Sequence, residues 1–166
     1  MNRKELEMGQ PAFLLAQVGA HAAAKFAEKL GVLQLTPPDA GILRLLRKSP
    51  GISQQELSSQ LQIHPSRLVA ILDSLETREL VERKLNPQDR RLYSLYLTEA
   101  GVLTLDRIGE VAREHQDAFL SSISGEERRI LAEILQRIAD AHGLTRGVHP
   151  GYKRMGNAKP TDLKCS

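Results

Sequence analysis

Positively charged side chains stand next to small polar ones at two places in the sequence. Ser66 and Arg67 follow a His-Pro pair, and Arg90 and Arg91 follow Asp89. A guanidinium group can donate two parallel hydrogen bonds to a phosphate, or to the O6 and N7 atoms of guanine. Both places therefore carry the side-chain chemistry that nucleic-acid binding needs.

The sequence gives little support to metal or catalytic chemistry. No histidine has a His, Asp or Glu at the spacing that would close a zinc site on one helix face, and His142, His149 and Cys165 form only a loose alternative. The single cysteine excludes an intrachain disulfide. Neither a glycine-rich phosphate loop nor a hydrolytic triad is apparent. We therefore predict no enzyme activity, no cofactor and no metal.

The composition is that of a globular protein with an uneven charge distribution. Of the 166 residues 41% are hydrophobic, which is enough for a packed core. No run approaches the ~18 apolar residues of a membrane span, and no secretory signal is apparent, so we expect a cytoplasmic protein without membrane contact. The formal charge is +2 over residues 36–98, −4 over 99–143 and +4 over 144–166. This distribution permits nucleic-acid binding by part of the surface.

Helical periodicity accounts for the first half of the chain. Apolar residues recur every four positions over 13–30, and Thr36-Pro37-Pro38-Asp39 begins a second helix that ends near Ser49. Ser53 and Glu56 form a capping box for a third helix. Pro65 begins a fourth, which ends near residues 79–80. Two short helices separated by a tight turn predict a helix-turn-helix.

The period then changes from 3.6 to 2. Residues 81–85 and 93–97 alternate around a polar turn and predict a β-hairpin with a charged tip. Thr98 and Ser124 can cap two further helices, and residues 144–166 lose the apolar period, which predicts a disordered tail. The first and last helices carry more apolar surface than so small a domain can cover, so we expect a homodimer.

The segment from Leu57 to Gly101 resembles the multiple antibiotic resistance regulator (MarR) family of transcription factors. The resemblance rests on Ile63-His64-Pro65-Ser66, Leu72-Asp73-Ser74-Leu75-Glu76, Leu80-Val81-Glu82-Arg83, Asp89-Arg90-Arg91 and Leu95-Tyr96-Leu97-Thr98-Glu99-Ala100-Gly101. It implies a mainly α fold, in the order α-α-α-α-β-β-α-α. The expected parts are an N-terminal dimerisation helix (1–35), a winged helix-turn-helix DNA-binding domain (36–98), C-terminal dimerisation helices (99–143) and a basic disordered tail (144–166).

The resemblance implies that the fourth helix reads the major groove of DNA and that the hairpin, or wing, reaches the neighbouring backbone or minor groove. Ala70 stands where similar proteins often have a basic residue, and Asn86 where they frequently have Asp. The expected DNA-binding residues are Ser66, Arg67, Val69, Ala70 and Ser74 on the helix, and Arg83, Lys84, Asp89, Arg90 and Arg91 on the wing.

The family also implies a small phenolic or lipophilic effector that releases DNA. Gln17, His21 and Phe26 on the first helix and Arg44 on the second are candidates to border its pocket, with Arg44 meeting an acid. Alternatively, Phe26 is a core residue and His21 is an interface residue. We expect a homodimeric repressor that binds a pseudo-palindromic duplex DNA operator. The alternative is a ligand- or protein-binding dimer that has lost DNA specificity, and it is motivated by Val69 and Ala70.

Overall fold

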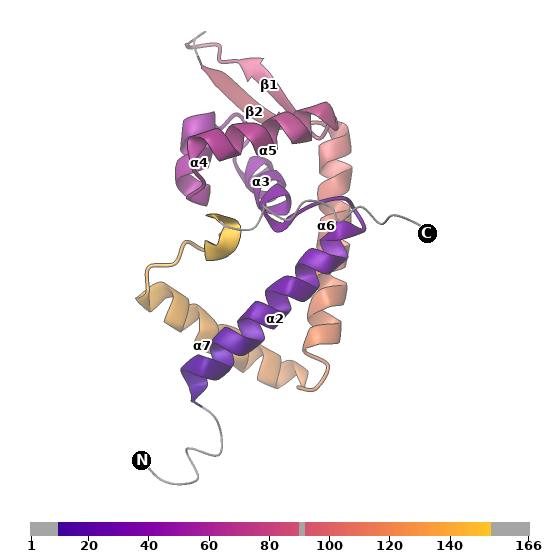
Figure 1. Cartoon of the computed structure of the whole chain (residues 1–166), viewed down its shortest axis with the longest axis vertical. Helices are drawn as coiled ribbons and strands as arrows, with labels where there is room; N and C mark the ends of the chain where they lie inside the picture. The colour runs from indigo at the N-terminus through magenta and orange to yellow at the C-terminus, as the bar shows by residue number, and fades with distance from the viewer. Residues whose placement is uncertain (1–9, 90–91, 154–166) are drawn as a thin grey trace, which may run out of the picture.

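The chain forms two lobes joined by one long helix. The computed structural model describes residues 10–89 and 92–153. Helix α6 (Glu99–Phe119) runs along one side of both lobes (Figure 1). The upper lobe holds α3 (Pro37–Lys48), α4 (Gln54–Leu61), α5 (Pro65–Thr77), β1 (Val81–Leu85) and β2 (Tyr93–Leu97). The lower lobe holds α2 (Pro11–Gly31) and α7 (Gly125–Ala141). This order confirms the predicted mainly helical fold with a single hairpin.

Side-chain caps begin the helices of the upper lobe where the sequence predicts. The Thr36 hydroxyl accepts a hydrogen bond from the backbone N–H of Asp39, whose carboxylate accepts one from the N–H of Thr36 at 2.7 Å. Ser53 and Glu56 cap α4 in the same way. The turn between α4 and α5 is held from within, because the buried Ser58 hydroxyl donates to the carbonyl of Ile63 at 2.7 Å. These bonds satisfy backbone groups that would otherwise be left without partners at the helix ends.

The core of the upper lobe is aliphatic. Leu43 and Leu46 of α3, Leu57 of α4, and Leu68 and Leu72 of α5 have at most 1% of their surface exposed. Leu95 of β2 is fully buried with them. Burying a leucine side chain contributes roughly 1.5–3 kcal/mol, so these contacts fix α5 relative to α3 and α4. The helix-turn-helix is thus a rigid support for whatever the outer face of α5 contacts.

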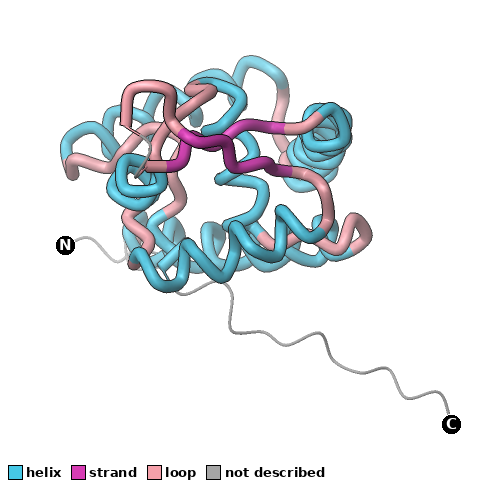
Figure 2. The backbone as a smooth tube through the Cα atoms, turned by 90° about the horizontal axis from the view of Figure 1, so that it is seen from above, coloured by secondary structure: helices cyan, strands magenta, loops and turns pink. Residues whose placement is uncertain are grey.

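The wing is an antiparallel hairpin that pairs Val81 with Leu97 and Leu85 with Tyr93. In the view from above it lies across the upper lobe (Figure 2). A third short stretch of chain joins it, since the N–H of Gly51 donates to the carbonyl of Leu95 at 2.9 Å. The wing is therefore tied to the segment that precedes α4.

Close contact at the base of the wing explains why Thr98 and Gly101 follow Leu97 at fixed spacing. Thr98 caps α6 through a bond from Gly101 N–H, and its own hydroxyl donates to the carbonyl of Glu79. A Cβ atom on Gly101 would lie 2.0 Å from the carbonyl oxygen of Leu80. Only glycine permits this approach, so the motif fixes the wing against the start of α6.

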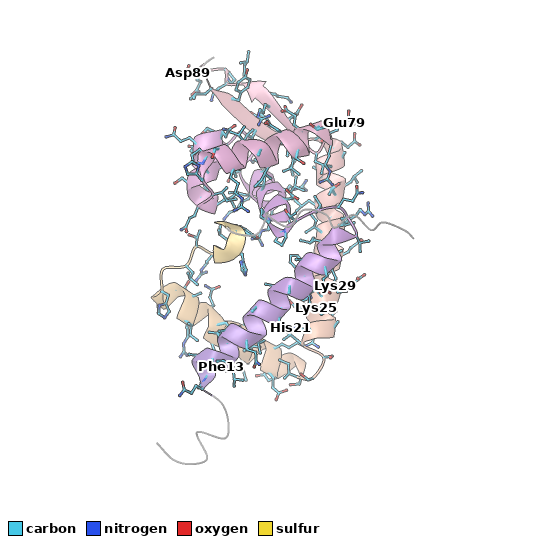
Figure 3. The ribbon with its side chains drawn as sticks, viewed as in Figure 1. Phe13, His21, Lys25, Lys29, Glu79 and Asp89 are labelled. Carbon is cyan, nitrogen blue, oxygen red and sulfur yellow. The ribbon has the colours of Figure 1, made fainter. Side chains whose placement is uncertain are left out.

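The lower lobe leaves much apolar surface uncovered. Helix α7 has no buried residue, and near its start Arg128 pairs with Asp117 of α6 at 3.0 Å and donates to the carbonyl of Leu120. Its Ile130, Ile134 and Ile138 are 44%, 43% and 41% exposed. Phe13 of α2 is 65% exposed, and it lies near the N-terminal end of that helix (Figure 3). No described helix is both long enough and apolar enough to cross a membrane.

The sequence predicts disorder from residue 144 onward, whereas the structure describes residues 144–153, which we call the C-terminal strap. The strap ends in the short 3-10 helix η1 (Pro150–Lys153), which lies below α3 in Figure 1. Tyr152 is 92% buried and joins the core, and Val148 packs against that core. Two isolated apolar residues thus anchor a segment that has no helical period. Residues 154–166, with Cys165, lie outside the described residues.

Candidate nucleic-acid interface

The outer face of α5 presents most of the side chains expected to read DNA. Ser66, Val69, Ala70 and Ser74 are exposed on it. Pro65 occupies the first turn, where its lack of an N–H costs no hydrogen bond. The Ser66 hydroxyl lies 2.8 Å from Nδ1 of His64, which caps the helix. The face is narrow and largely uncharged, so it offers few strong hydrogen bonds to bases.

Arg67 differs from the other expected base-reading residues. Its side chain is half-buried and lines a hollow with Ser58, Gln62, Ile63 and His64, at the turn between α4 and α5. To grip a guanine it must turn outward from this hollow.

Arg83 joins the wing to α5. Its guanidinium donates to the Asp73 carboxylate at 2.7 Å and also binds Glu76, and only 17% of the side chain is exposed. Burial opposes the charge on Arg83, but hydrogen bonds to both carboxylates outweigh burial and raise the pKa of the guanidinium. The phosphate contact expected of Arg83 would require breaking these pairs. Its geometry indicates a residue that positions the wing.

Lys84 lies on the exposed side of the hairpin. Its ammonium pairs with Glu82 at 2.6 Å and stands 5.2 Å from the centre of the Tyr96 ring. Both partners of the ion pair are at the surface, where such a pair contributes little and exchanges readily for a phosphate.

The tip of the wing is shaped by Asn86. Its side-chain oxygen accepts hydrogen bonds from the backbone N–H groups of Gln88 and Asp89 at 2.9 and 3.3 Å. A neutral amide oxygen thus organises the turn. Asp89 stands at the tip (Figure 3) and its carbonyl accepts from Leu92 N–H. Arg90 and Arg91 lie outside the described residues, so their contacts stay a prediction.

A hollow of about 440 Å³ on the same side of the lobe was not foreseen from the sequence. It lies between the starts of α4 and α5 and the end of the wing, where Tyr93 is 51% exposed. Its lining is Ser53, Gln54, Gln55, Pro65, Leu92 and Tyr93. Two helix N-termini converge here, and the partial positive charge of a helix N-terminus favours anions such as backbone phosphates. The capping box was the signal for one of these termini.

The four residues expected at an effector pocket do not come together. His21 and Phe26 stack instead on α6: His21 lies 6.0 Å from the Phe119 ring and Phe26 5.5 Å from the His115 ring. Gln17 is exposed on α2, and Arg44 lies beside the strap. The His115 ring is also 5.4 Å from Phe119, and burial followed by the charge of Lys29 lowers its pKa. The alternative expectation for Phe26, a packing role, fits this geometry.

A further hollow follows a different face of α2. It measures about 690 Å³ and is mostly apolar. Its lining is Leu15, Ala16, Gly19, Ala20, Ala23, Ala24, Ala27, Leu35, Thr36, Pro37 and His149. We call it the α2 groove. Among the described residues no group of His, Cys, Asp and Glu is placed to hold a metal ion.

Comparison with known proteins places this arrangement in a family. Residues 35–93, from the start of α3 into β2, match the MarR family. A candidate transcriptional regulatory protein for the hcr operon of Thauera aromatica is 30% identical over 131 residues, which cover 78% of this chain and 79% of that protein.

Solved structures share the fold over most of the chain. The transcriptional repressor CouR bound to a 23-mer DNA duplex superposes with a TM-score of 0.71 at 32% identity, covering 84% of this chain and 98% of CouR. Rv2887 of Mycobacterium tuberculosis, in complex with p-aminosalicylic acid, gives a TM-score of 0.65 at 26% identity, covering 79% and 99%.

Proposed function

The chain belongs to the MarR family of DNA-binding transcriptional regulators, and we propose that it is a homodimeric repressor of a pseudo-palindromic operator. The observation that carries this is the pairing of α5 with the wing through Arg83, Asp73 and Glu76. This pairing holds α5 and the wing side by side on one face. A protein that reads the major groove with a helix and the flanking DNA with a wing requires this arrangement. Twofold symmetry then predicts half-sites ~10 bp apart.

In this proposal the winged domain (36–98) binds DNA, and the helices of residues 1–35 and 99–143 form the dimer. The exposed apolar residues of α2 and α7 support it, since contiguous apolar surface of this kind marks an interface. A second copy supplies the missing cover because closed twofold dimers bury the same patch of both subunits. Arg90 and Arg91 would reach the duplex from the wing, with Lys84 and Asp89 beside them.

The α2 groove is our candidate for the effector site. It lies between the dimerisation helix and the start of α3, so a ligand there contacts both lobes. Its alanine-rich wall suits a flat phenolic or lipophilic molecule, and Rv2887 was solved with such an aromatic compound. A ligand could bind more tightly to an arrangement of the lobes that does not fit B-DNA. It would then raise the population of that arrangement and weaken operator binding.

The alternative function is a ligand- or protein-binding dimer that recognises no DNA sequence. The neutral outer face of α5, with Val69, Ala70 and Ser74 exposed, favours it.

The deciding experiment selects binders from a random duplex pool and measures fluorescence anisotropy on the winning sequence across a salt series. We expect a palindrome bound at least ~10³-fold tighter than bulk DNA, with a steep negative salt slope. Arg90→Ala should weaken binding at least ~10-fold, and Arg137→Ala on α7 should not. Weak binding without sequence preference would establish the alternative function, and unchanged affinity of Arg90→Ala would refute the role of the wing.

A further inference from the structure

The C-terminal strap docks on α3 by a close steric fit. The Tyr152 ring covers Gly41, where a Cβ atom would lie only 2.6 Å from Cε2 of the ring. The backbone of the strap is held by its own turn, since the Gly151 N–H donates to Nδ1 of His149 at 2.9 Å. A side chain as large as tyrosine, 92% buried against a glycine, fixes the position of the strap.

Docking gathers three cations around one hollow. Arg44 and Lys48 of α3 and Arg146 of the strap line a space of about 290 Å³, which Leu61 and Val148 also line. The Arg44 guanidinium lies over Gly147, whose φ of +75° permits the tight turn there. A Cβ atom on Gly147 would stand 3.0 Å from Nη2 of Arg44. The strap therefore forms one wall of the hollow and leaves room for the guanidinium.

The charges around the hollow are not balanced. None of its lining residues is acidic. Asp140, a nearby carboxylate, binds Arg146 at 2.8 Å and also accepts from Gln136. Within residues 10–89 and 92–153, no hydrogen bond or ion pair engages the side chain of Arg44 or Lys48. The Asp140 carboxylate and the partial negative charge of about one half at the C-terminal end of α3 together offset only part of the three positive charges.

We propose that this hollow binds a phosphate-bearing small molecule with more than one negative charge, such as a phosphate monoester or a pyrophosphate. The Arg44 guanidinium suits phosphate oxygens by paired hydrogen bonds, and Lys48 adds a point charge. Arg146, which donates from Nε and Nη2 to the Asp140 carboxylate, adds its positive charge from within that pair. A bound anion joins α3 to the strap and thereby to α7. This site is separate from the α2 groove and from the DNA-binding face, so it does not depend on the function proposed above.

The test is calorimetric titration of the full-length protein with inorganic pyrophosphate at low ionic strength, in the absence of DNA. Arg44→Gln should weaken binding at least ~10-fold, because a bidentate charged contact is lost. Arg47→Gln, which removes the neighbouring cation of α3 from outside the hollow, should bind as the wild type does. Equal binding by Arg44→Gln, or equal loss in Arg47→Gln, would overturn the site.

Two further arms test where the anion binds and which anion the hollow prefers. If Arg90→Ala loses pyrophosphate while Arg44→Gln retains it, the anion binds the wing and the proposal is wrong. Succinate offers two carboxylates and should bind at least ~10-fold more weakly than pyrophosphate. Equal affinity for succinate would overturn the assignment to phosphate.

The role of the strap is tested by Gly41→Ala. At an open helical site this change raises the melting temperature. Here the new Cβ meets the Tyr152 ring, so we expect a lower melting temperature and weaker pyrophosphate binding. In a Tyr152→Ala background the same change should no longer destabilise. A rise in melting temperature for Gly41→Ala alone, with unaltered binding, would show that the strap does not build the site.

Discussion

At the scale of single residues, Arg83 connects the two DNA-facing elements. Removing its side chain leaves Asp73 and Glu76 close together without a cation between them. We expect Arg83→Ala to lower the free energy of unfolding by about 1–2 kcal/mol, since the pairs are only partly screened. Operator affinity should fall while the salt slope stays constant, because no phosphate contact is lost.

Urea denaturation and anisotropy at several salt concentrations check this prediction. Lys84→Ala, which removes an exposed pair, is the matched control and should hardly change stability. A reduced salt slope for Arg83→Ala would instead assign Arg83 to a phosphate.

His115 makes stability depend on pH. Burial between Phe26 and Phe119 lowers its pKa in the folded protein, so the unfolded chain binds the proton more readily. The contribution of this group is fully present above its unfolded pKa of about 6.5 and is lost as the pH falls below that value. We expect a lower free energy of unfolding at about pH 5.5 than at about pH 7.5.

His115→Leu should reduce this pH dependence without abolishing it, because burial also lowers the pKa of His149 in the strap. Urea unfolding at both pH values is the measurement. An identical pH profile for His115→Leu and wild type would exclude His115 as a source.

At the scale of elements, capping decides where α3 begins. Thr36→Ala removes the hydroxyl that accepts from Asp39 N–H and donates to its carboxylate, while the bond from the backbone N–H of residue 36 to that carboxylate is kept. We expect a loss of about 1–2 kcal/mol in the free energy of unfolding, measured by urea denaturation. Thr36→Ser keeps the hydroxyl and should retain most of that stability. Equal losses in both variants would assign the effect to the Thr36 methyl group.

The same local signals explain which elements were predictable. Capping boxes at Ser53 and Ser124 and the change of period at Val81 are readable in sequence, and these elements form as predicted. The predicted end of α5 lies two or three residues too late: Glu79 adopts a φ of +57°, and nothing local marks that turn.

Tertiary contacts limited the prediction of the site. The rotation of α2 about its own axis turns His21 and Phe26 toward α6 and away from the α2 groove. Packing between the two helices sets this rotation, and the spacing of apolar residues in the sequence does not determine it. The strap was missed because Tyr152 meets Gly41 across a long sequence separation, and neither residue has a local pattern.

At the scale of the whole molecule, α7 buries none of its residues against its own chain. A second copy covering its isoleucines should make the protein a dimer in sedimentation equilibrium. Ile134→Glu places a charge in that surface, so we expect the affinity of the two copies for each other to fall at least ~10-fold, and operator binding to be lost with it.

Gln136→Glu adds the same charge on the opposite side of α7, because Gln136 is two residues from both Ile134 and Ile138, and it should remain dimeric. A monomeric wild type that still binds a palindrome with full affinity would contradict the proposed assembly.

The fit of Tyr152 on Gly41 also orders events during synthesis. The tyrosine follows the glycine by 111 residues, which a ribosome adds in roughly 5–20 seconds at typical elongation rates. Throughout that interval the nascent upper lobe acquires its helices and wing but keeps an uncovered glycine on α3. The strap can attach only in chains translated through residue 152, after every other described element has been synthesised. A transcript truncated shortly before this codon would yield a protein with every DNA-facing element. That protein would lack the contact between α3 and the strap that follows α7.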